Sequence, residues 1–157
     1  MNSTKTLWPK RVPKALAQGI EGIAFGDLFL EDVRTYREKQ LKHTGLEPIF
    51  PLWRQPTRQL ANEMIAAGVR AKLTCVDTQQ LDARFLGREF DEAFLAELPA
   101  GADPCGENGE FHSFVYAGPV LNQEIPVLLG ETVVRDQFVF ADLTRASSSR
   151  SRSSRRL

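Results

Sequence analysis

The chain has 157 residues, enough for one domain with a substantial core, and its 42% hydrophobic and 25% charged content is ordinary for a globular protein. The formal net charge is zero, but five arginines and no acid lie in residues 145–157, so the remainder is mildly acidic and gives no general argument for nucleic-acid binding. Two cysteines without a CxxC pair argue against a disulfide scaffold, and without an apolar run of membrane-spanning length or a signal-peptide core we expect a cytoplasmic protein.

The N-terminal segment, residues 1–18, is predicted to be irregular because prolines interrupt it twice. Only Ala15–Gln18 is expected to form the last turn of a helix, with Gly19 as its stop. Its basic residues are also typical of a mitochondrial presequence, but Pro9 and Pro13 would break the amphipathic helix that such a signal requires.

Strands and helices then alternate through residues 19–68 and into the next strand. This alternation implies parallel crossovers and predicts an α/β fold, and the family resemblance described below implies that its parallel sheet is part of a Rossmann-like sheet. The expected elements are strand 20–25, helix 30–43, strand 48–53, helix 56–67 and strand 69–76.

Gly26 and Asp27 end the first of these strands, so the Asp27 carboxylate is expected at the carboxyl edge of the sheet, where ligands bind in open α/β folds. The alternative role for Asp27 is the N-cap of the following helix, and the two roles are compatible.

After Asp77 the pattern becomes α+β, so residues 69–144 are expected to form a second region with an antiparallel sheet. Asp91 is predicted to cap a short helix that ends before Pro99. Three short strands are expected at 125–129, 131–135 and 138–142, with turns at Gly130 and at Asp136–Gln137. Residues 145–157 form a Ser/Arg tail that we expect to be disordered. Such a tail could bind RNA, be phosphorylated or be inert, and we expect no nucleic-acid partner.

The stretch Asp103–Pro119 combines a polar, glycine-containing loop with an alternating apolar run, Phe111–Tyr116, that predicts a buried strand. Glycines allow the backbone to adopt positive φ or to approach a ligand closely, and loops of this kind often carry binding sites. The alternative is a tight turn with solvated acids. The chemistry-bearing residues are Gly106, Glu107, Asn108, Gly109, Glu110 and His112.

These motifs together resemble the diphthine–ammonia ligase family, also described as diphthamide synthases and as PP-loop ATP pyrophosphatases of the adenine nucleotide alpha hydrolase-like group. The matching segments are GDLFLEDVR at 26–34, Pro51–Trp53, Ala71–Asp77, Leu86–Arg88 with Asp91, and Asp103–Pro119 with its GENGEFH core. The resemblance covers about residues 19–142, the C-terminal two-thirds of the family pattern. It implies an ATP- and Mg-dependent ligase that adenylates a carboxylate and condenses it with ammonia. The acceptor would be a modified histidine of elongation factor 2 or a small molecule.

The resemblance also implies roles for individual residues. Glu107, Glu110 and His112 would be catalytic, with Glu110 or His112 accepting a proton as ammonium becomes the nucleophile. Nucleotide binding would fall to Gly26, Asp27, Asp32 and Arg34, although Asp32 and Arg34 could instead form a surface ion pair. Substrate binding would involve Arg88, Gly106, Asn108 and Gly109, although Arg88 could instead bridge to Asp91. The spacing of Cys105, His112 and the acids matches no common zinc pattern, so no metal site is predicted.

One family feature has no counterpart in the sequence. Family members carry an SGGxDS loop that holds the ATP pyrophosphate, and no Ser-Gly-Gly sequence occurs here. We therefore expect a truncated member, a pseudo-enzyme that only binds, or one half of a split enzyme. Losing the central strands of the parallel sheet should also leave apolar faces of strand 20–25 exposed.

Overall fold

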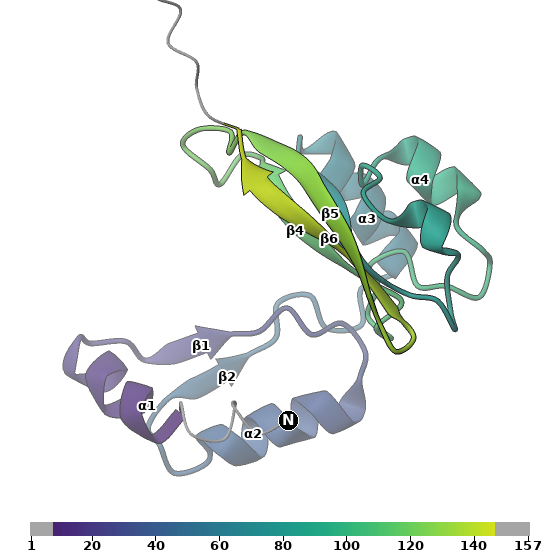
Figure 1. Cartoon of the computed structure of the whole chain (residues 1–157). Helices are drawn as coiled ribbons and strands as arrows, with labels where there is room; N and C mark the ends of the chain where they lie inside the picture. The colour runs from purple at the N-terminus through teal and green to yellow at the C-terminus, as the bar shows by residue number, and fades with distance from the viewer. Residues whose placement is uncertain (1–7, 147–157) are drawn as a thin grey trace, which may run out of the picture. The chain divides into compact units, whose positions relative to one another are not determined.

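The computed structural model describes the backbone of residues 8–146 and divides the chain into two compact units, Met1–Pro56 and Thr57–Leu157. Figure 1 shows the elements of each unit. Helices and a parallel pair of strands form the first unit, and an antiparallel sheet with helices forms the second. This mixed architecture fits the α/β class expected from the sequence, while the Rossmann-like nucleotide fold stays a prediction.

Helix α1, Trp8–Ala17, begins earlier than predicted, and the expectation of an irregular segment up to residue 14 is wrong for the described part. Pro13 lies inside this helix, and Val12 and Ala15 on either side pack in the apolar cluster of the first unit. The predicted stop is confirmed. Gly19 has a φ of +76°, its N–H bonds to Leu16 O, and Ile20 N–H reaches back to Ala15 O, which is the Schellman arrangement.

The first unit contains one strand–helix–strand crossover. Strand β1 (Gly22–Ala24) pairs in parallel with β2 (Glu47–Ile49), and α2 (Glu31–Leu41) connects them. A small apolar cluster of Val12, Leu41 and Leu46 packs beneath the pair. The expected exposure of apolar side chains in strand 20–25 is confirmed only at Ile20, which is 43% exposed, because Ile23 and Phe25 pack against this cluster.

The second unit is built on a four-stranded antiparallel sheet with the strand order β4-β3-β6-β5. Helix α3 precedes β3 along the chain, and the short helix α4 follows it. A single 3₁₀ turn, Ala83–Phe85, lies between β3 and α4. The bounds are α3 Thr57–Ala66, β3 Arg70–Asp77, α4 Glu92–Glu97, β4 Phe111–Ala117, β5 Val127–Arg135 and β6 Phe138–Arg145.

The third predicted strand exists as β3, but the prediction that it continues the parallel sheet is wrong. Both strand partners of β3 run antiparallel to it, and α3 belongs to the second unit rather than to the expected region 19–68. A β-α-β pattern fixes the order of elements along the chain and not the sheet that each strand joins, because either sheet would bury the same apolar residues.

Two further predictions about the sheet are corrected. The strands expected at 125–129 and 131–135 are one continuous strand, β5, with a register irregularity between Leu129 and Thr132 in place of a turn at Gly130. The turn at Asp136–Gln137 is confirmed, with Asp136 at a φ of +53°. Strand β4 is not buried throughout, since only its residues Phe111 and Tyr116 are buried.

The core of the second unit lies between the sheet and its helices. Phe94 of α4 is fully buried and meets Phe85, Phe90 and Phe111 with ring-centroid distances of 5.3–5.7 Å. Asp91 caps α4 as predicted, accepting a hydrogen bond from Phe94 N–H at 2.7 Å. These contacts anchor the segment that leads into the 103–110 loop. The Ser/Arg tail expected to be disordered lies almost entirely outside the described residues.

Candidate functional site

The loop Asp103–Glu110 is held together by two buried carboxylates. Asp103, 7% exposed, accepts hydrogen bonds from the backbone N–H groups of Cys105 (3.1 Å) and Glu107 (2.9 Å) through Oδ2. Glu110, 1% exposed, accepts from Asp103 N–H at 2.7 Å and from the Asn108 side-chain amide at 3.1 Å through Oε1. Each carboxylate therefore joins two parts of the loop through hydrogen bonds, and these bonds within the loop make it rigid.

The loop is also tied to the sheet. Glu110 O accepts from the backbone N–H of Asp77, the last residue of β3, at 2.9 Å. Asp77 is itself buried, and its carboxylate accepts from Gln79 N–H and from the Gln80 side chain. The second Glu110 oxygen, Oε2, is buried and has no hydrogen-bond partner among the described residues. The Glu110 side chain is therefore placed to orient the loop, while its solvent access is minimal.

Of the two loop glycines, Gly106 has the stricter structural requirement. Its φ is +70°, and a Cβ there would lie 2.9 Å from Phe111 O and 3.1 Å from Phe111 Cζ. Gly109 has a φ of +86°, but a Cβ there would meet nothing within 4 Å. Gly106 is thus required both for its backbone conformation and for close packing on Phe111.

Cys105 lies behind the loop, where its thiol donates a long hydrogen bond to Thr57 O at 3.4 Å. Burial, followed by the charges of Asp103 and Glu107, raises the pKa of this thiol to about 12. The thiol is therefore protonated at neutral pH and is not an activated nucleophile. It lines an apolar pocket of about 190 Å³ beside the loop.

The other residues predicted for this region are distributed around the loop. Glu107 is half-buried, Asn108 is exposed, and His112 on β4 is exposed and pairs across the sheet with Cys75. Arg88 donates to Glu97 at 2.7 Å, which raises its pKa, so its ion-pair partner is Glu97 and not the predicted Asp91. The structure thus brings Glu107, Asn108 and Glu110 together in one loop.

The residues predicted to bind nucleotide lie in the first unit. Asp27 is not a helix cap, because Leu30 occupies the N-cap of α2. Its Oδ2 lies 3.5 Å from Arg37 Nε, an ion pair without a hydrogen bond, since neither atom has a hydrogen-bond partner. Arg34 lies 4.7 Å from the ring centroids of both Phe50 and Trp53 and donates to Glu38 at 2.8 Å. The predicted alternative of an Asp32–Arg34 pair is not observed.

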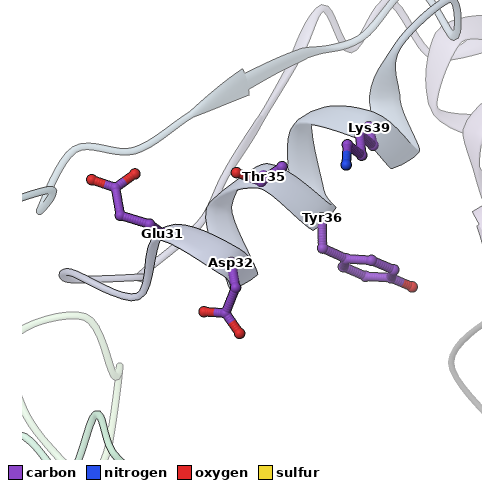
Figure 2. Close-up of a pocket in the computed structure, with 5 residues that line it drawn as sticks. All are labelled: Glu31, Asp32, Thr35, Tyr36 and Lys39. Atoms are coloured by element: carbon purple, nitrogen blue, oxygen red, sulfur yellow. The ribbon is translucent and has the colours of Figure 1, made fainter.

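Asp32 lines a shallow depression on the surface of α2. Figure 2 shows its five lining residues projecting from this one helix, with the carboxylates of Glu31 and Asp32 at one end diverging from each other. The remaining members are Thr35, Tyr36 and Lys39. Because a single helix supplies the whole lining, this depression does not enclose a ligand.

Comparison with known proteins resolves the identity of the second unit. A family model described as the diphthamide synthase C-terminal domain matches residues 56–148, well over half of the chain. The chain belongs to this family. The matched residues begin at the boundary between the two units and include α3, the whole antiparallel sheet and the 103–110 loop.

Similarity to proteins named diphthine–ammonia ligase extends into the first unit. The chain is 32% identical to the diphthine–ammonia ligase of Homo sapiens over 127 residues, which are 78% of this chain and 48% of that protein. It is 31% identical to the Mus musculus ligase over 136 residues, and 29% identical to the Schizosaccharomyces pombe ligase over 119 residues, 20% of that protein. The chain spans about half the length of the mammalian relatives.

In this diphthamide synthase-family chain, the residues expected to bind nucleotide make contacts within the first unit. A Cβ on Gly26 would meet nothing within 4 Å, so the space beside this residue is open. Asp27 faces Arg37, and the Arg34 guanidinium is already stacked and paired. Nor do the described residues contain a group of three or more His, Cys, Asp or Glu side chains placed to hold a metal ion. No described helix is long and apolar enough to cross a membrane.

Sequence reasoning missed the part played by Asp103 and Asp77. Asp103 organises the loop as much as Glu110 does, and Asp77 links the loop to β3. A signal for Asp103 was present, since Asp before Pro with Cys and Gly following is typical of a side chain that bonds backbone N–H groups two to four residues onward.

Proposed function

We propose that this chain supplies the acceptor-binding part of an amide-forming ligase of the diphthine–ammonia type. The family match over residues 56–148 carries the proposal, because it coincides with the structural unit that holds the 103–110 loop. In this proposal Asp103 and Glu110 fix the loop backbone, and the more accessible Glu107 and Asn108 contact the acceptor or ammonia. The acceptor is a carboxylate such as diphthine, a modified histidine of elongation factor 2.

The loop has the charge expected for such a role. Residues 103–110 contain three carboxylates and no basic side chain, so their field favours a cationic group such as ammonium. His112 lies at the exposed start of β4, two residues beyond Glu110, where it can accept a proton from ammonium once substrate is bound. The ATP chemistry requires an SGGxDS loop, which the 157 residues do not contain.

A reconstitution experiment tests this function. The chain is mixed with a polypeptide containing an SGGxDS segment, ATP, Mg, ammonium and elongation factor 2 bearing diphthine, and AMP release is measured. AMP that requires both polypeptides supports the proposal. Absence of AMP with every complement, while the acceptor still binds, contradicts it.

A second candidate function is a binding module that recognises the same acceptor without catalysis. The Arg34 guanidinium, expected at the nucleotide site, already stacks on Phe50 and Trp53 and pairs with Glu38, which favours this candidate. Equilibrium titration of diphthine-bearing elongation factor 2 against the chain measures this binding directly. ATP hydrolysis by the isolated chain would eliminate this candidate.

A further inference from the structure

Strand β4 has one edge without a strand partner. Among the residues that the structure describes, β4 pairs only with β3, and the sheet ends there. The four residues from His112 to Val115 are all exposed, including Phe114 (39%) and Val115 (41%), while Phe111 and Tyr116 on either side are buried. An apolar, exposed edge of this kind is a template for pairing with another polypeptide.

The direction of the backbone groups shows what this edge offers. Glu110 O and His112 O both point toward β3, where they meet Asp77 N–H and the Thr74 hydroxyl, whereas Phe111 O lies beside Gly106. Because N–H and C=O groups alternate sides along a strand, those of Ser113 and Val115 point outward. The open edge of β4 therefore presents the backbone N–H and C=O groups of Ser113 and Val115, which have no strand partner among the described residues.

An apolar pocket opens beside the same edge. Its volume is about 190 Å³, room for one apolar side chain, and it lies next to the 103–110 loop through Cys105 and Phe111. Ser113 and Val115 of β4 contribute to its lining, together with Met64 and Val69. A strand added to the β4 edge would place alternate side chains on this face of the sheet.

We propose that an extended segment of the acceptor polypeptide adds to the β4 edge as a fifth strand and inserts an apolar side chain into this pocket. The inference rests on the proposed function. Its occupant follows from continuity, because β4 begins directly after Glu110 and a segment paired at residues 113–115 lies beside the acidic loop. In the proposed function diphthine is a residue of a polypeptide, so the acceptor brings a length of backbone to the loop together with the modified side chain.

The test is titration of the full chain with elongation factor 2 bearing diphthine, comparing two matched variants. Val115→Glu places a charge on the pocket wall, and Val134→Glu makes the same change at a 68% exposed valine on β5, the opposite edge strand. Val115→Glu is expected to weaken binding by about tenfold or more, and Val134→Glu by less than about twofold. Ser113→Pro, which removes an outward N–H without removing a bond to β3, is expected to act like Val115→Glu.

Amide hydrogen exchange provides the second readout. In the free chain the N–H groups of Ser113 and Val115 should exchange rapidly and that of Phe114 slowly, and acceptor should protect Ser113 and Val115 selectively. Acceptor binding that is unaffected by Val115→Glu and gives no such protection would overturn the edge proposal and leave the proposed function intact. No acceptor binding to the unaltered chain would overturn both. Protection that appears with chain concentration alone, or that disappears on deleting residues 147–157, would assign the edge to a second copy or to the tail and refute the proposal.

Discussion

The buried Glu110 carboxylate provides the most direct test of how the loop is built. Its Oε1 accepts two hydrogen bonds, and the donor at Asp103 N–H is buried with no other partner described. In Glu110→Ala that donor loses its acceptor, at about 1–3 kcal/mol, and one buried methylene is lost at about 0.8 kcal/mol. The Asn108 amide is exposed and regains water. We expect the free energy of unfolding of the second unit to fall by about 2–4 kcal/mol.

Glu110→Gln is the matched control for this substitution. It keeps an acceptor at the Oε1 position and changes only Oε2, which has no partner. The weaker neutral hydrogen bonds are offset by removing an uncompensated charge from the interior, so we expect a loss of about 1 kcal/mol or less.

The assay is urea unfolding followed by far-ultraviolet circular dichroism. Both tryptophans, Trp8 and Trp53, belong to the first unit, so their fluorescence provides an internal control that should not change. Equal losses for the alanine and glutamine variants, or an alanine loss below about 1 kcal/mol, would show that the carboxylate does not hold the loop by accepting hydrogen bonds.

Three further predictions concern the same unit. Gly106→Ala should lower the free energy of unfolding by about 2 kcal/mol or more, because it combines positive φ with a clash on Phe111. Gly109→Ala, which has positive φ but no clash, should lower it by only about 1 kcal/mol. Equal losses for the two variants would contradict the close packing at Gly106. The pKa of the Cys105 thiol is raised to about 12 in the folded chain, so the buried neutral thiol contributes fully to the free energy of unfolding below about pH 9, and this contribution is lost as the pH rises toward 12. Iodoacetamide should label Cys105 at pH 8 only after the chain unfolds. Asp91→Ala removes the cap of α4 and should cost about 1 kcal/mol in thermal unfolding, and a cost near zero would show that the cap is dispensable.

Local signals predicted much of the fold. Gly19 and the Asp91 cap were placed correctly because each depends on a few neighbouring residues. The partner of Arg88 was wrong because two acids lie within reach of the guanidinium, and their distances depend on how α4 packs. The continuous strand β5 was divided at Gly130 because a glycine in a bulge and a glycine in a turn give the same sequence pattern.

The amino-acid sequence by itself determined the family and most of the order of elements after residue 19, because these depend on residue types and spacing along the chain. It also pointed to residues 103–112 as the candidate site, which stays a prediction. Only the tertiary structure decided that β3 joins an antiparallel sheet and that the Glu110 side chain turns inward to hold the loop. The same holds for the edge of β4, which has no strand partner among residues 8–146. The partners of a strand and the burial of a carboxylate depend on which segments, distant in the sequence, donate hydrogen bonds to them and exclude water from them. A local sequence pattern does not specify these distant segments.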